Sequence, residues 1–294
     1  MTIARFLPWL DRSGTFSPLK AAVFALLFVP GLVLAWRLAT NALGPRPVTE
    51  AIHETGDWAI RWLLVSLAVT PLRRITGWNR LILVRRMVGL AALGYALVHF
   101  LLYTVDLDFA LGKVASEIAL RFYLTIGFVA LSGLAILGVT STDAMIRRLG
   151  RKWNSLHRVV YLLAVLGVVH FFIQSKADVY EPTLMAGALL ALLLYRLANA
   201  RGFDIASPLV LAAIAVLAAL LTAGAEYLWY AVATGIPPMR VLLANLQFSF
   251  SIRPAWWVLA GCMGVALLAL LRPFLGGRPP SRTRGSRVAA PAGR

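Results

Sequence analysis

Cysteine is almost absent from this chain of 294 residues, in which Cys262 is the only one. One thiol excludes an intrachain disulfide, a CxxC redox pair and an iron–sulfur cluster held by cysteines. The sequence also has no Gly-x-Gly-x-x-Gly turn after a strand and no phosphate-binding loop. We therefore expect the chain to carry no nicotinamide or nucleotide domain of its own.

Charged residues are also scarce. They make up 14% of the chain, against 60% for apolar residues, whereas a soluble domain carries about a quarter. Because so few charges cannot cover a water-facing surface, most of the surface must face lipid. The expected fold class is an all-α polytopic membrane protein. Eight apolar segments reach or approach the length of about 20 residues that a membrane span needs: 21–39, 58–72, 87–105, 122–139, 159–173, 184–197, 208–232 and 254–271.

The second of these segments is the weakest, because Arg61 lies one turn inside its start, so seven spans are the alternative to eight. With the N-terminus in the cytoplasm and the spans alternating, most of the 29 basic residues fall on the inner side and most of the 12 acidic residues on the outer side. This is the positive-inside pattern of an inner (cytoplasmic) membrane protein with both termini cytoplasmic. It also explains the net charge of +17 by attraction to anionic lipid headgroups rather than by nucleic-acid binding.

Two of the four histidines lie deep within spans, where ionisable residues are rare and indicate function. His99 lies about 20 Å along the third span from its cytoplasmic start, and His170 about 18 Å along the fifth, which runs in the same direction. Two neutral imidazoles at matching depth can bind one heme iron from opposite faces, with the porphyrin filling the apolar gap between helices. His99 and His170 are therefore the predicted ligands of an outer heme.

A second, inner heme is predicted near the cytoplasmic boundary, where His157 and Arg85 share one depth. It would lie about 20 Å from the first. On a straight helix, however, His157 and His170 point about 140° apart, so a kink or two differently placed porphyrins would be required. A headgroup-facing role for His157 and ordinary inner-side charge for Arg85 are equally consistent with the sequence. His53 is interpreted as a residue of the first outer loop.

Other readings of the histidines stay open at this point. A histidine in a span can simply hydrogen-bond a neighbouring helix, and His99 and His170 could form a proton relay in a heme-free transporter. The second reading is disfavoured because no pair of spans shows the interrupted symmetry of inverted repeats. A scaffold protein, and a ferric-chelate or quinone reductase on the same heme core, are further alternatives.

Several motifs together resemble those of the MsrQ family, the heme-binding membrane subunits of bacterial periplasmic methionine-sulfoxide reductase systems within the ferric-reductase-like transmembrane group. The resemblance covers roughly residues 1–200. It rests on Thr55-Gly56, Thr70-Pro71-Leu72, Arg85-Arg86 with Gly89 and His99, Arg121-Phe122-Tyr123-Leu124-Thr125, Thr140-Ser141-Thr142-Asp143-Ala144-Met145, Leu149-Gly150, Trp153, Leu156-His157 and Tyr161-Leu162.

The resemblance implies a six-helix core, residues 1–204, that binds one or two b-type hemes. His99, His157 and His170 fall on the family's histidine positions, and Arg85 on a basic position proposed for the inner site. FMN is implied by the resemblance alone, without a recognisable site. Electrons would come from quinol or a cytosolic flavin reductase and leave to a periplasmic molybdopterin-containing methionine-sulfoxide reductase. The chain would relay electrons, with no catalytic side chains of its own.

The sequence departs from this family after about residue 204. Residues 205–275 contain two extra apolar spans without histidine, with Glu226 near the outer end of the first. We interpret this region as a packing or partner-docking addition. Residues 276–294 are rich in Gly, Pro, Arg and Ser and are expected to form a disordered cytoplasmic tail.

Overall fold

The computed structural model describes residues 7–11, 13–176, 178–249 and 251–272. Within these ranges the chain is helical, apart from an isolated bridge between Leu10 and Phe16. The elements in order are α1 (Pro18–Ala39), α2 (Pro47–Thr76), η2 (Asn79–Leu83), α3 (Arg85–Asp106), α4 (Leu111–Leu120), α5 (Phe122–Val139), α6 (Asp143–Leu149), α7 (Arg151–His157), α8 (Val160–Ser175), α9 (Tyr180–Ala200), α10 (Pro208–Ala233), α11 (Pro238–Ala244) and α12 (Pro254–Leu271).

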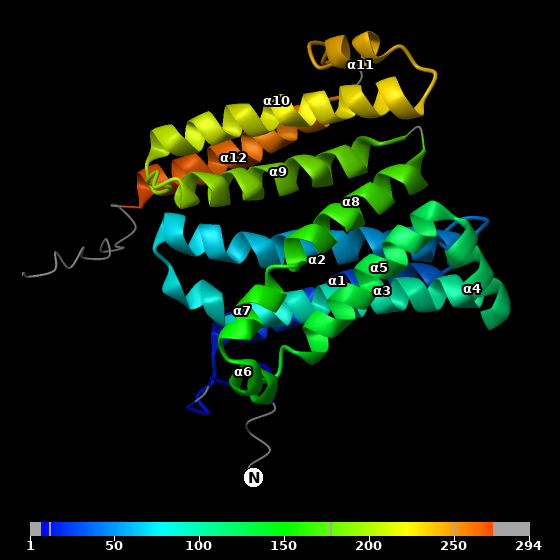
Figure 1. Cartoon of the computed structure of the whole chain (residues 1–294), viewed down its shortest axis with the longest axis horizontal. Helices are drawn as coiled ribbons and strands as arrows, with labels where there is room; N and C mark the ends of the chain where they lie inside the picture. The colour runs from blue at the N-terminus through cyan, green and yellow to red at the C-terminus, as the bar shows by residue number, and fades with distance from the viewer. Residues whose placement is uncertain (1–6, 12, 177, 250, 273–294) are drawn as a thin grey trace, which may run out of the picture.

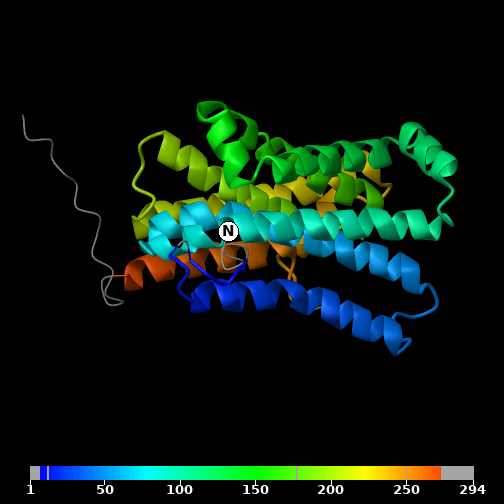
Figure 2. The same cartoon turned by 90° about the horizontal axis from the view of Figure 1, so that it is seen from below.

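The long helices lie side by side along the long axis of the molecule in both views (Figures 1 and 2). The short helices α4 and α11 lie at one end, and η2, α6 and α7 at the other. The second end carries the basic residues Arg80, Arg147, Arg148, Arg151 and Lys152. We call it the inner end, because the positive-inside pattern predicts the cytoplasmic side there. We call the end with α4 and α11 the outer end.

Seven helices of the described chain are long and apolar enough to cross a membrane, namely α1, α3, α5, α7 with α8, α9, α10 and α12. The chain is therefore a multi-pass membrane protein, and the helices match seven of the eight predicted segments. The eighth segment, 58–72, lies within α2, whose 30 residues include charged side chains that lower its hydropathy.

Helix α2 is the central helix of the bundle, which explains its composition. It packs against α1, α3, α8, α9 and α12 and buries apolar residues on several sides, among them Leu63, Leu64 and Leu67. Because protein rather than lipid surrounds much of α2, its polar residues find partners. Arg61 Nη2 lies 3.0 Å from the Glu181 carboxylate of α9 and 3.8 Å from that of Asp57. Gly77, at φ +74°, ends the helix with its N–H bonded to the Arg73 carbonyl, as is typical of a left-handed C-cap.

The two extra spans, α10 and α12, pack on α9 to form one layer of the bundle (Figure 1). The interface is built from small residues, which let helix backbones approach closely in a membrane. A Cβ on Gly187 of α9 would lie 2.4 Å from Thr222 Oγ1 and 2.6 Å from Val258 Cγ2. α9 in turn contacts α2 and α8, so the C-terminal region is attached directly to the predicted core. The predicted tail, 276–294, lies outside the described residues.

Candidate functional site

A cavity of about 980 Å³ lies between α2, α3, α5, α8 and α9. Both deep histidines, His99 and His170, line it. Around them the wall is mostly aliphatic and aromatic, with Ile60, Leu63 and Phe100 among its residues. Apolar side chains therefore surround the two imidazoles on much of the wall, whose charged residues are Asp57, Asp178, Glu181 and Arg253.

The His99 ring is fixed by α2, the helix next to its own helix α3. His99 Nδ1 lies 2.8 Å from the backbone carbonyl oxygen of Ile52. One turn further along α2, Gly56 leaves room for the ring, since a Cβ there would lie 3.0 Å from His99 Nδ1. The close approach of ring and helix therefore favours glycine at this position.

The His170 ring is held in the same way by α5, the neighbour of α8. His170 Nδ1 lies 2.8 Å from the carbonyl oxygen of Tyr123, and a Cβ on Gly127 would lie 2.9 Å from both Nδ1 and Cε1 of the ring. In each hairpin the histidine follows its carbonyl partner by 47 positions, and the glycine follows that carbonyl by one turn. The helix pairs α2–α3 and α5–α8 thus hold their histidines through the same set of contacts.

These contacts determine which ring nitrogen can bind a ligand. A carbonyl oxygen can only accept, so Nδ1 of each neutral ring carries the proton and donates it, and Nε2 keeps its lone pair. Metal-binding histidines are commonly oriented by such a bond from the second nitrogen. Both imidazoles are therefore in the tautomer that can bind a metal through Nε2.

The separation of the two rings fits one shared iron atom. Their centroids lie 6.3 Å apart, with the ring planes at 85°. An imidazole nitrogen binds a transition metal at about 2 Å, and adding about 1.1 Å from nitrogen to ring centre on each side gives roughly 6 Å between centroids. The described residues contain no group of three or more His, Cys, Asp or Glu side chains that could hold a metal ion alone. A porphyrin, which supplies four nitrogens of its own, fits this two-imidazole set.

His53 also lines the cavity, and here the loop interpretation was wrong. α2 begins at Pro47, where proline with its fixed φ is suited to the first turn of a helix. His53 is therefore helical, one turn before Gly56, and its side chain is exposed. It contributes a polar group to the outer part of the cavity wall.

His157 and Arg85 do not line this cavity. The His157 ring stacks on Trp153, with centroids 3.9 Å apart, and its Nε2 lies 3.1 Å from Thr140 Oγ1. Because the Thr140 hydroxyl donates to the Ile136 carbonyl at 2.8 Å, it accepts from His157 Nε2–H. Arg85 Nη1 lies 3.4 Å from Thr70 Oγ1. The structure thus brings His99 and His170 together and leaves His157 apart, and the inner heme stays a prediction.

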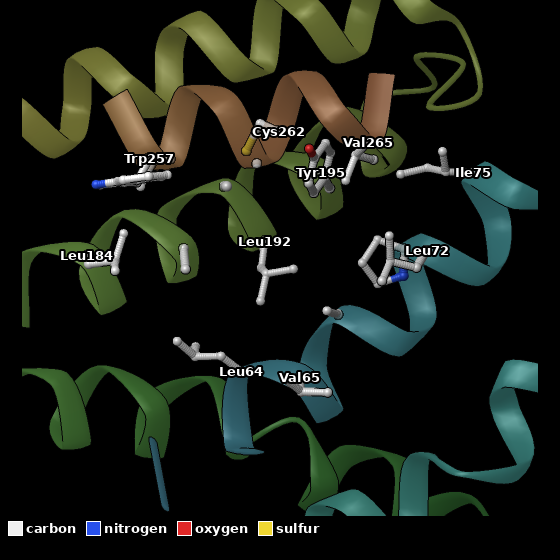
Figure 3. Close-up of a pocket in the computed structure, with 16 residues that line it drawn as sticks. Leu64, Val65, Leu72, Ile75, Leu184, Leu192, Tyr195, Trp257, Cys262 and Val265 are labelled. Atoms are coloured by element: carbon white, nitrogen blue, oxygen red, sulfur yellow. The ribbon is translucent and has the colours of Figure 1, made fainter. Parts of the chain in front are cut away.

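A second cavity, of about 310 Å³, lies between α2, α9 and α12 (Figure 3). Its wall is apolar, and Tyr195, Trp257 and Cys262 carry its only polar side-chain atoms. None of the described residues that line it is cationic, so it does not fit the phosphate of FMN.

The residues that orient the two imidazoles were not predicted from the sequence. The signal that could have found them is an internal repeat. Val98-His99-Phe100 and Val169-His170-Phe171 each follow a glycine, Gly56 or Gly127, at the same spacing. The contribution of Arg253 to the cavity wall has no such sequence signal, because it comes from the C-terminal region.

Comparison with known proteins identifies the family of the chain. The family described as "Ferric reductase like transmembrane component" matches residues 55–168. The chain is 44% identical over 184 residues to the protein-methionine-sulfoxide reductase heme-binding subunit MsrQ of Xanthomonas campestris pv. campestris (strain 8004), which covers 60% of this chain and 84% of that protein. It is 42% identical over 192 residues to the MsrQ of Rhodospirillum rubrum, covering 65% of this chain and 90% of that protein. No solved structure matches the chain. The chain therefore belongs to the MsrQ family of protein-methionine-sulfoxide reductase heme-binding subunits, whose transmembrane component is ferric-reductase-like.

Proposed function

We propose that this chain is the electron-transfer subunit of a methionine-sulfoxide reductase system, with one b-type heme bound between His99 and His170. The observation that carries the proposal is the matched pair of imidazoles, each with Nδ1 bonded to a carbonyl at 2.8 Å and both facing one cavity. A structural histidine that only bridges two helices would not explain why two of them meet with their Nε2 lone pairs unused.

The side chains would hold and insulate the group rather than react. Heme would supply a one-electron couple, and no side chain of this chain makes or breaks a bond. The carbonyls of Ile52 and Tyr123 make the imidazoles more basic through their Nδ1 hydrogen bonds. The apolar wall lowers the local dielectric, and ligation and burial together set the reduction potential.

The proposed route runs towards the outer end of the bundle. The cavity's polar residues include Asp57 on the outer part of α2, Asp178 just before α9 and Glu181 in the first turn of α9, so the heme edge would be nearest the periplasm. Electrons would arrive from quinol or a cytosolic flavin reductase, since the sequence shows no nucleotide motif of its own. They would leave to a periplasmic molybdopterin-containing reductase that repairs oxidised methionine. The proposal includes a location in the bacterial inner membrane with both termini cytoplasmic, which the positive-inside pattern supports.

An inner heme and FMN are separate from the proposed outer heme. A second heme near His157 would require His157 Nε2 to leave Thr140, to which it is bonded at 3.1 Å. FMN, which the family resemblance implies, is assigned to no residue. The proposal for the outer heme depends on neither.

The decisive experiment is a dithionite-reduced-minus-oxidised spectrum of detergent-purified protein, with heme per chain measured as pyridine hemochrome. We expect a b-type α-band that disappears in His99→Ala and His170→Ala, while His53→Ala, which also alters the cavity wall, keeps it. Full heme content in the His99→Ala/His170→Ala double variant would refute the assignment.

A second measurement separates the partner from the competing ferric-chelate reductase activity. The reduced protein is mixed with the periplasmic catalytic subunit and methionine sulfoxide, or with ferric chelate alone, and heme reoxidation is followed. Reoxidation that requires the catalytic subunit supports the proposed route. Equally fast reoxidation by ferric chelate alone would favour the alternative acceptor.

A further inference from the structure

The C-terminal region contributes directly to the wall of the heme cavity. Tyr230 of α10, and Ser251 and Arg253 just before α12, line it together with the core helices. Arg253 is the only lysine or arginine among the described residues of the wall, which also carries three carboxyl groups, those of Asp57, Asp178 and Glu181. The only fixed positive charge on the cavity wall thus comes from outside the predicted heme-binding core.

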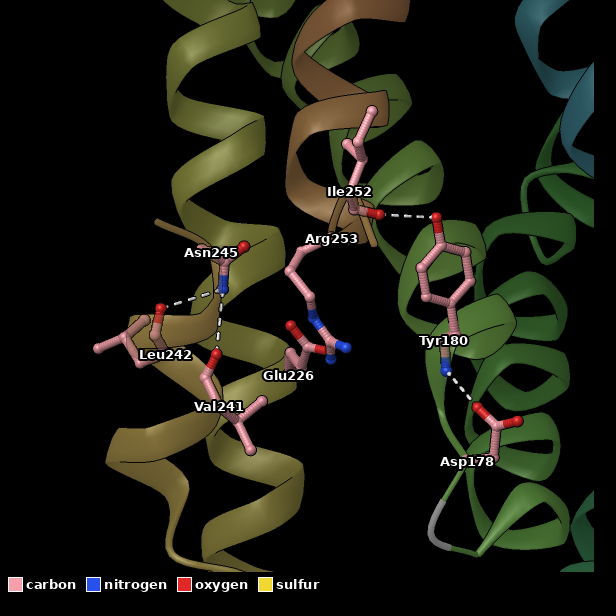
Figure 4. A network of polar contacts seen from close by, with 8 residues as sticks. All are labelled: Asp178, Tyr180, Glu226, Val241, Leu242, Asn245, Ile252 and Arg253. Carbon is pink, nitrogen blue, oxygen red and sulfur yellow. Dashed lines mark hydrogen bonds and ion pairs between the residues drawn. The ribbon is translucent and has the colours of Figure 1, made fainter. Parts of the chain in front are cut away.

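Arg253 is held firmly in this position. Its Nη2 forms an ion pair with Oε1 of Glu226, which lies on α10 and is fully buried. The adjoining Ile252 carbonyl accepts a hydrogen bond of 2.9 Å from the Tyr180 hydroxyl of α9 (Figure 4). Figure 4 shows the guanidinium of Arg253 against the Glu226 carboxylate, with Tyr180 approaching from the neighbouring helix. The arginine is therefore fixed to both α9 and α10.

The bond to Glu226 leaves part of the guanidinium group unused. Arginine has five N–H donors in a planar fork that suits carboxylates. Arg253 Nε is buried and has no hydrogen-bond partner among the residues that the structure describes, and the side chain is only 20% exposed. The exposed part of the guanidinium lies on the cavity wall, where an anion in the cavity can accept from its N–H groups.

We propose that Arg253 anchors a propionate of the heme. The inference rests on the proposed function, because it takes a heme between His99 and His170 as its starting point. A b-type heme carries two propionates, and the carboxylates of the wall would repel them, so Arg253 is the charged group that can receive one. The C-terminal region is then part of the cofactor site, and Arg253 is a positioning residue for the porphyrin.

The competing explanation is that Arg253 serves only to neutralise Glu226, since removing one partner of a buried ion pair is strongly destabilising. A set of charge variants separates the two roles. Arg253→Gln removes the cation, Glu226→Gln frees it, and the Glu226→Gln/Arg253→Gln double variant removes both charges without leaving either unpaired. Arg240→Gln is the control, because Arg240 is an exposed arginine of α11 in the same region and does not line the cavity.

The readouts are heme loss to excess apomyoglobin and the midpoint potential of the bound heme. A hydrogen bond to a charged group contributes enough that its loss should accelerate heme release about tenfold or more. We expect this in Arg253→Gln and equally in the double variant. The potential should fall in both, because removing a nearby cation favours the ferric form. Arg240→Gln should retain heme as the unmodified chain does. Glu226→Gln, which keeps the cation but removes the carboxylate that positions it, should release heme more slowly than Arg253→Gln.

The inference would be overturned if the double variant held heme with unchanged release and potential, because Arg253 would then only neutralise Glu226. Unchanged heme properties in Arg253→Gln would overturn it as well, while leaving the proposed function intact. Unmodified protein without heme would instead overturn the proposed function and this inference together.

Discussion

Replacing Gly127 by alanine tests whether the position of the His170 ring, and not merely its presence, holds the heme. A Cβ at this position would lie 2.9 Å from both Cε1 and Nδ1 of His170, whereas ordinary contacts begin at 3.4 Å. The ring, or the helix that carries it, must therefore move by about 0.5 Å, which is the tolerance of a well-built ligand constellation. The same movement strains the 2.8 Å hydrogen bond from Nδ1 to the Tyr123 carbonyl.

The expected effect on heme is large and the expected effect on folding is small. Disturbing the groups that orient a metal ligand typically costs 10–100-fold in metal affinity. Alanine is meanwhile about 0.5–1 kcal/mol better than glycine in a helix interior, which offsets part of the strain. Gly127→Ala should therefore accumulate in the membrane as a folded protein and contain far less heme. Gly56→Ala should show a milder loss, because its Cβ would meet His99 Nδ1 at 3.0 Å.

The assay is pyridine hemochrome per purified chain, together with the reduced spectrum and the thermal unfolding midpoint in detergent. Gly94→Ala is the matched control: Gly94 lies on α3, the helix of His99, and has nothing within 4 Å of the position of a Cβ. Full heme content in Gly127→Ala would refute the reasoning. Equal heme loss in Gly94→Ala would show that the bundle responds to any added methyl group and not to the contact with His170.

Two further predictions concern residues away from the paired imidazoles. His157→Ala should leave the α-band of the outer heme unchanged, because His157 does not line its cavity. A heme-to-chain ratio that falls from two to one in this variant would reveal an inner heme. Loss of all heme would contradict the separation of the two sites. Gly187→Ala should lower stability by about 1–3 kcal/mol through overpacking, since its Cβ would lie 2.4 Å from Thr222 Oγ1. An unchanged unfolding midpoint in detergent would show that α9, α10 and α12 can separate at no cost.

The lipid-facing helices could be predicted from the sequence almost to the residue. The segments 122–139 and 254–271 coincide with α5 and α12. These helices have few polar positions because lipid surrounds much of their surface, so hydropathy locates their ends. α2 behaves differently: the predicted segment 58–72 covers only half of a helix that runs from Pro47 to Thr76. Hydropathy reports contact with lipid, and α2 is largely enclosed by other helices.

Some features of the candidate site could also be predicted from the sequence, and others could not. The depth of His99 and His170 follows from the rise per residue of an α-helix, and the structure places the two rings 6.3 Å apart. The carbonyls of Ile52 and Tyr123 could not be predicted, because the rotation of each helix about its axis depends on packing against its neighbours. His157 illustrates the same limit. The break between α7 and α8 changes the direction of its side chain, so an angle calculated for a straight helix does not apply.

A comparison of the ion pairs near the outer end also supports the inference on Arg253. Arg37 pairs with Glu54 between α1 and α2, and Arg61 with Glu181 between α2 and α9, but all four side chains are at least 27% exposed. Pairs of this kind contribute little to stability.

The Arg253–Glu226 pair is the most buried of the three, with side-chain exposures of 20% and 1%. Replacing a buried ion pair by apolar residues of similar volume is often neutral or even stabilising, so stability alone does not explain why a charged pair occupies this place. A guanidinium that must face the heme cavity does explain it, because a cation can be kept in an apolar wall only beside a buried carboxylate. On this reasoning Glu226 is the residue that keeps Arg253 charged and in place, and the propionate is the ligand that the arrangement is built to bind.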